Sequence, residues 1–149
     1  MKLAEALQER ADTNRRIEQL RVRLSNNAQK QEGEKPAEDP ADLLKELDQC
    51  IAKQAELIAD INLANAKTTV NGKTLTEMIA QRDMLNVQIS AYRDLINEAS
   101  ATYQRARNSE IRILSAVNVK ELQKKADALS KELRLLDNKI QETNWLTEM

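Results

Sequence analysis

Apolar residues recur at alternating steps of three and four in four stretches of this chain, the spacing that keeps an apolar stripe on one side of a helix. The clearest stripe is the last, with Val119, Leu122, Ala126, Leu129, Leu133, Leu136 and Ile140. The four stretches predict a mainly α fold, with long antiparallel helices near residues 2–28, 40–66, 75–100 and 119–144 that pack along heptad seams as a helical bundle or coiled coil. We interpret residues 1–149 as a single elongated helical domain.

The first three stripes differ in width and continuity. Arg10, Thr13 and Asn14 interrupt the first stripe, and Arg82 interrupts the third. The second helix carries two rows side by side, Leu44, Leu47, Ile51, Ile58 and Ile61 next to Leu43, Cys50, Leu57 and Ala64. A stripe this wide predicts two neighbouring elements rather than one. Gln54 falls within it, at a kind of position where polar residues often fix register or oligomeric state.

The first two connections carry clear local signals. Residues 26–40 are polar and lack apolar periodicity, which predicts an exposed linker. The linker ends with Asp39 as a helix N-cap and Pro40 at the first helical position. In the second connection, Asn71-Gly72 suits the positive φ angles of a two-residue turn. We therefore predict a short β-hairpin near residues 68–75, with a plain loop as the alternative.

The last two helices each begin with a predicted capping box, Thr74 with Glu77 and Asn118 with Glu121. Before the second of these boxes, residues 110–117 (EIRILSAV) place isoleucine and valine at alternate positions. This alternation favours a β-strand over a helix. Because a lone strand leaves its backbone groups unpaired, we expect this strand to pair with the hairpin, within one chain or between chains.

Charge and composition restrict the partners. The chain has 23 basic and 24 acidic residues and a net charge of −1. Non-specific binding to nucleic acid or to an anionic membrane needs an excess of basic residues, so this balance argues against both. Aromatic residues make up only 2 % of the chain, which suits a seam of aliphatic side chains. Five arginines crowd the first helix, at positions 10, 15, 16, 21 and 23. The acids between them favour intrahelical salt pairs on a solvated face over a ligand-binding patch.

No reaction centre is visible in the sequence. The chain has no histidine, which removes Ser–His and Cys–His nucleophile pairs and histidine metal sites. Its one cysteine, Cys50, lies on the apolar side of a predicted helix and is interpreted as a small buried hydrophobe rather than a reactive thiol. We therefore predict no enzyme activity, no catalytic, cofactor-binding or metal-binding residues, and no cofactor. The charged start of the chain and the absence of any long apolar run predict a cytoplasmic protein.

Several stretches also resemble a known family. They are NRRIEQLRVRL (14–24), QEGEKPAEDP (31–40), the Asn-Gly turn followed by TLTE (71–77), SAYRDLI (90–96), RNSEIRILSAVNV (107–119) and SKELRLLDNKIQETNW (130–145). They cover most of the chain in order and resemble a small family of uncharacterised bacterial helical proteins, some of them labelled septicolysin-like. The resemblance implies a bacterial source and a coiled-coil build, and the label implies a cytolytic toxin.

These observations favour a structural or interaction protein that self-associates through its coiled-coil seams. We expect a homo-oligomer, most simply a dimer. The first helix has an interrupted stripe and would pack poorly as the fourth helix of a bundle, and the second helix has a wider apolar stripe than one partner covers. We expect neither nucleic acid nor membrane as a partner. The alternatives are a septicolysin-like membrane-acting protein and a nucleic-acid accessory protein that uses the arginine-rich first helix.

Overall fold

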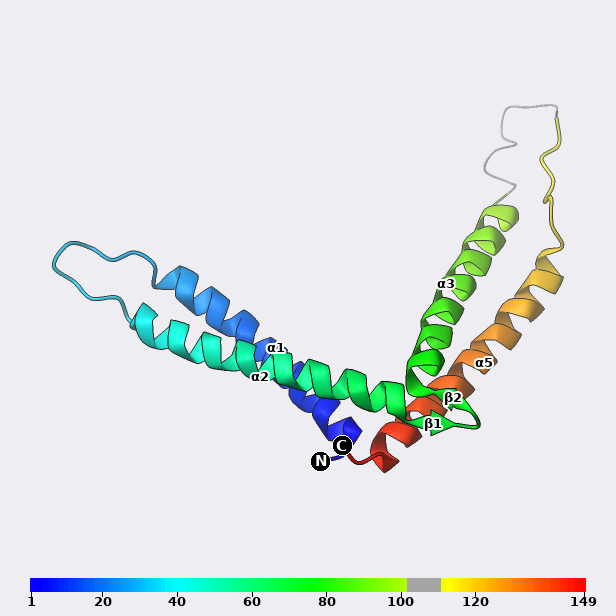
Figure 1. Ribbon diagram of the computed structural model, residues 1–149. Coiled ribbons are helices and arrows are strands. Elements are labelled where there is room, and N and C mark those ends of the chain that lie inside the picture. The colour runs from blue at the N-terminus through cyan, green and yellow to red at the C-terminus, as the bar shows by residue number, and fades with distance from the viewer. Residues whose placement is uncertain (102–110) are drawn as a thin grey trace. The chain divides into compact units, whose positions relative to one another are not determined.

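The computed structural model describes residues 1–101 and 111–149 (Figure 1). Its elements in chain order are α1 (Leu3–Asn26), α2 (Pro40–Lys67), β1 (Thr69–Val70), β2 (Lys73–Thr74), α3 (Leu75–Ser100) and α5 (Val119–Leu146). The predicted mainly α fold is confirmed, and the ends of these helices lie within two residues of their predicted positions. Among the described residues, no helix combines the length and the hydropathy needed to cross a lipid bilayer.

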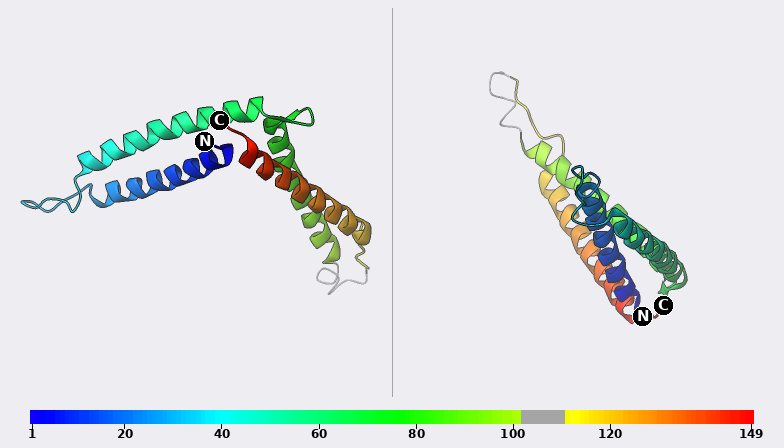
Figure 2. Two further views of the ribbon diagram at one scale, coloured as in Figure 1. Left: turned by 90° about the horizontal axis from the view of Figure 1, so that it is seen from below. Right: turned by 90° about the vertical axis from the view of Figure 1, so that its left-hand side faces the viewer.

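The chain divides into two compact units, residues 1–70 with 143–149, and residues 71–142. In the first unit, α1 and α2 lie side by side and antiparallel (Figures 1 and 2). Leu3, Leu20 and Ile61 are almost completely buried in this unit. The end of the chain returns to its start, because the Leu3 amide donates to the Thr147 carbonyl over 2.9 Å and the Met149 amide donates to the Met1 carbonyl over 3.0 Å.

The local signals of the first two connections are confirmed. Asp39 caps α2 and accepts a hydrogen bond of 3.0 Å from the Ala41 amide, and Pro40 is the first helical residue. Asn71 and Gly72 adopt φ angles of 51° and 82°, and they join β1 to β2 in a two-stranded sheet. Glycine takes this left-handed conformation without strain and asparagine tolerates it, which is why this pair makes the turn.

The second unit is an antiparallel pair of helices, α3 and α5 (Figures 1 and 2). The capping box of α3 is confirmed, since the Glu77 amide donates to Thr74 Oγ1 over 3.1 Å and the Thr74 amide donates to Glu77 Oε2 over 2.9 Å. The stripe of α5 faces inward as predicted, with Ala126 and Ile140 buried and its other five members half-buried. Arg82, which interrupts the stripe of α3, reaches Asp137 of α5 over 3.6 Å.

The prediction of a strand over residues 110–117 is wrong for residues 111–117, and residue 110 lies outside the described residues. Residues 111–117 form bends and irregular chain, with Ile111 and Leu114 77 % and 71 % exposed. The two arms of the hairpin are two residues long and pair with each other in a two-stranded sheet, so residues 111–117 do not pair with the hairpin within one chain. An alternating apolar pattern is not enough to make a strand, because a strand also needs a neighbouring strand to form its ladder.

Candidate interaction surfaces

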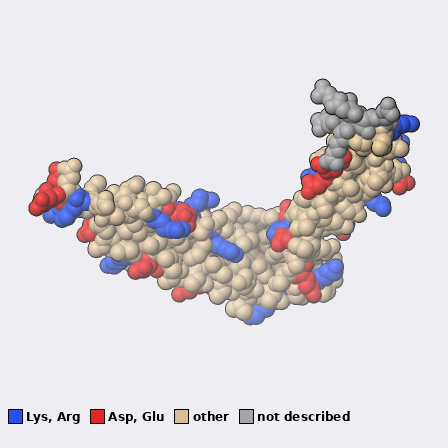
Figure 3. Space-filling model, turned by 90° about the horizontal axis from the view of Figure 1, so that it is seen from above, with Lys and Arg blue, Asp and Glu red and all other residues tan. Residues whose placement is uncertain are grey.

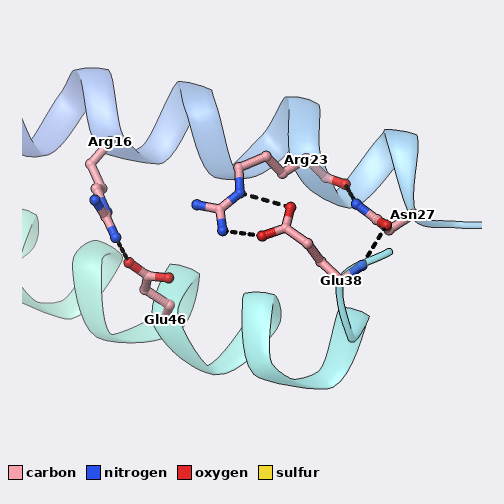
Figure 4. A network of polar contacts seen from close by, with 5 residues as sticks. All are labelled: Arg16, Arg23, Asn27, Glu38 and Glu46. Carbon is pink, nitrogen blue, oxygen red and sulfur yellow. Dashed lines mark hydrogen bonds and ion pairs between the residues drawn. The ribbon is translucent and has the colours of Figure 1, made fainter. Parts of the chain in front are cut away.

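The arginines of α1 were predicted to form salt pairs within the helix; two of them do, and two others pair with residues outside it. Arg15 pairs with Asp12, and Arg21 with Glu18 at 3.1 Å, both within α1. Arg16 pairs with Glu46 of α2 (Figure 4). On the face drawn in Figure 3, basic and acidic side chains are interspersed along the helices, with no large area of one sign. The fixed positive charge of α1 is therefore largely compensated within the molecule.

The fourth pair, between Arg23 and Glu38, holds the two ends of the linker together. Arg23 Nε donates to Glu38 Oε2 over 3.0 Å, and a second guanidinium nitrogen contacts the other carboxylate oxygen (Figure 4). Asn27, just after α1, donates to the Arg23 carbonyl over 2.8 Å and accepts from the Glu38 amide over 2.9 Å. The hydrogen bond from Arg23 lowers the pKa of Glu38, and the same bond raises the pKa of Arg23. The predicted linker is therefore exposed along residues 28–35, while contacts of Glu38 with Arg23 and Asn27 hold its two ends together.

The wide stripe of α2 is only half covered. Leu43 and Leu57 of one row are buried, together with Ile61 of the other. Leu44 and Ile51 are each 49 % exposed. The reason is that α2 packs along one neighbour in its unit, α1, and one neighbour covers one row. The second neighbour that this width predicts stays a prediction.

The exposed row of α2 continues across a groove onto α1. The groove has a volume of 430 Å³ and is lined by Leu7, Arg10, Ala11, Asn14, Gln54 and Ile58. Gln54 Nε2 donates to the Arg10 carbonyl over 3.1 Å, while Gln54 Oε1 is buried without a hydrogen-bond partner. We call Leu7, Ala11, Leu44, Ile51 and Ile58 the hairpin face.

A second exposed stripe lies on α3 in the other unit. Its members Ala80, Met84, Val87, Ala91 and Leu95 follow steps of three and four, and we call them the α3 stripe. Met84, Val87 and Leu95 are 62 %, 59 % and 44 % exposed. The stripe is on the side of α3 opposite to its buried residues, such as Leu85 and Ile89. Helix α3 is therefore apolar on two opposite sides.

A pocket of 640 Å³ lies where the two ends of the chain meet α2. Its apolar lining includes Leu57, Ala64 and Met149, and Glu148 lies at its polar side. Glu148 contacts the Lys2 amine over 2.7 Å and the terminal amine of Met1 over 3.3 Å. Hydrogen bonds from Lys2, which has the larger effect, and from the terminal amine of Met1 lower the pKa of Glu148. The carboxylate here is engaged in holding the chain ends together.

No arrangement for catalysis emerges from these residues. Cys50 is a free, half-buried thiol between the helices of the first unit. In the described ranges, no group of three or more Cys, Asp and Glu side chains is placed to hold a metal ion. The predicted lack of catalytic, cofactor-binding and metal-binding residues stays a prediction. The feature that the sequence did not locate is the exposed second side of α3.

Comparison with known proteins places the chain in a family. Residues 10–149 match a family of unknown function, DUF6847, and the chain belongs to this family. It is similar over 100 % of its length, with 37 % identity and a TM-score of 0.94, to 98 % of a chain described as a functionally unknown conserved protein from Corynebacterium diphtheriae. No curated protein matches. Neither description carries the septicolysin-like label, and the neighbour's bacterial source agrees with the resemblance.

Proposed function

We propose that this member of the DUF6847 family is a non-enzymatic structural or interaction protein that self-associates through its apolar helix faces. The observation that supports this proposal is that α2 and α3 are each apolar on a side that no described element of their own unit covers. The proposal keeps the cytoplasmic location expected from the sequence.

Exposed apolar residues are ordinary on a protein surface when they are scattered, but these are aligned. Leu44 and Ile51 are seven residues apart on α2, and Met84, Val87 and Leu95 follow helical spacing on α3. Continuous apolar patches are a mark of protein interfaces. Burying the exposed half of one such side chain contributes about 1 kcal/mol, so a row of them favours association.

Light scattering after gel filtration tests the proposal. We expect a mass of at least about 34 kDa, twice the chain mass of 16.9 kDa, at micromolar protein concentration. A well-folded protein that stays at 16.9 kDa up to 100 µM, with the helical far-ultraviolet dichroism expected from four long helices, would contradict it. Leakage of dye from anionic lipid vesicles at submicromolar protein would instead support the septicolysin-like alternative.

A further inference from the structure

We propose that the hairpin face is the self-association surface, and that it packs against the hairpin face of a second copy about a twofold axis beside Ile51. This inference rests on the proposed function and adds to it the surface and the symmetry. The pair of copies would complete a four-helix bundle from two α1–α2 hairpins, and so would cover the second row of α2.

The spacing of apolar residues on α2 fits such an axis. A twofold contact places the same surface of both copies together, so each residue must meet an acceptable residue after the exchange. Leu44, Ile51 and Ile58 are seven residues apart and lie on one side of α2. An axis at Ile51 places Ile51 against Ile51 of the second copy, and Leu44 against Ile58 of the second copy. Every contact along this row is therefore apolar.

The same axis crosses α1 near Asn14. Leu7 and Ile58 line one groove, and Gln54 bonds to the carbonyl of Arg10. Because α1 and α2 are antiparallel, these pairs put the level of Ile51 on α2 at residues 13–14 of α1. Rotation about that level carries Leu7 to the level of Arg21, whose methylene stem can pack against an apolar side chain.

Polar and charged groups of this surface also find complements. The rotation brings the Asn14 side chains of the two copies together at the axis, one helical turn from Gln54, whose Oε1 is buried and has no partner. A polar pair of this kind inside an apolar seam fixes register. Arg10 is carried next to Glu18 of the second copy, which places opposite charges together.

The area is also adequate. A helix of 24 residues is about 36 Å long and two packed helices are about 20 Å wide, so the face covers roughly 700 Å² per copy. Stable interfaces bury about 800 Å² per partner. The α3 stripe fits a twofold contact less well. An axis midway between Val87 and Ala91 exchanges Asp83 with Leu95 and Met84 with Asp94, so a carboxylate meets an apolar side chain at each end of the stripe and loses its water.

The first test is Ile51→Glu, with Met84→Glu as the matched control. Both side chains are exposed, at 49 % and 62 %, so both variants should keep the helical dichroism of the wild type. Two glutamates facing each other at the axis should raise the dissociation constant of the dimer by about 100-fold or more, seen as a mass of 16.9 kDa in light scattering. The Met84→Glu variant should keep the mass of the wild type.

A second test uses a crosslink and does not depend on weakening the dimer. In a Cys50→Ser background, Ile51→Cys places one thiol per copy beside the axis, so mild oxidation should give a disulfide-linked dimer on a non-reducing gel. Met84→Cys in the same background should give little crosslinked product. If the wild type is dimeric but Ile51→Glu stays dimeric and Ile51→Cys fails to crosslink, the surface is wrong and self-association stands. If the wild type is monomeric, both proposals fail.

Discussion

Replacing Leu85 by alanine should destabilise the protein much more than replacing Leu95, although both leucines lie on α3. Leu85 is 6 % exposed and faces α5, whereas Leu95 is 44 % exposed and belongs to the α3 stripe. Removing a buried leucine side chain loses its transfer free energy and leaves a cavity, together about 2–5 kcal/mol. A two-helix unit can partly close such a gap, so we expect the lower half of this range, about 3 kcal/mol. At Leu95, much of the side chain is already in water, and about 1 kcal/mol or less should be lost.

Chemical denaturation followed by dichroism at 222 nm, at one fixed protein concentration, measures both losses. The fixed concentration matters because the apparent stability of an oligomer depends on it. Equal losses at the two positions would mean that the two sides of α3 are buried alike. In that case the inward and outward faces assigned to α3 would be incorrect.

Three further outcomes are expected. Thr74→Ala removes the side-chain acceptor of the Glu77 amide and should cost about 1 kcal/mol in the same denaturation assay. Since the pKa of Glu38 is lowered by Arg23, its contribution to stability is complete above its ordinary value of 4.5 and is lost as the pH falls through the lower folded value. The advantage of the wild type over Glu38→Gln should therefore shrink between pH 7 and pH 3. Arg15→Ala should change stability by no more than the error of the measurement, because its pair with Asp12 is exposed.

The parts of the fold that depend on neighbouring residues in the chain could be predicted from the sequence. Asp39 and Pro40 define the start of α2 through their own backbone requirements, and Asn71-Gly72 defines its turn in the same way. The helices follow from apolar spacing, which is also a local property. Predictions of this kind needed no knowledge of what the helices pack against.

The parts that depend on distant partners were the ones that failed or stayed incomplete. Residues 111–117 have the alternation of a strand, but a strand exists only where another strand offers its hydrogen bonds. The two rows of α2 were visible in the sequence, yet the choice of Leu43 over Leu44 as the buried residue depends on where α1 lies. Periodicity indicates how wide an apolar stripe is, and packing decides which half of it is covered.

The polar residues that interrupt the apolar stripes also act through contacts with a neighbouring helix. Arg82 breaks the stripe of α3 and reaches Asp137 on α5, and the carbonyl of Arg10 on α1 accepts the amide of Gln54 on α2. Each of these contacts joins two helices at one level, so it selects one register among those that an aliphatic seam would tolerate. Gln54 Oε1 has no such contact within its own unit. An interruption with a partner in the chain sets the register of the hairpin, and Asn14, which is exposed at the groove, is where a second copy would set the register of the assembly.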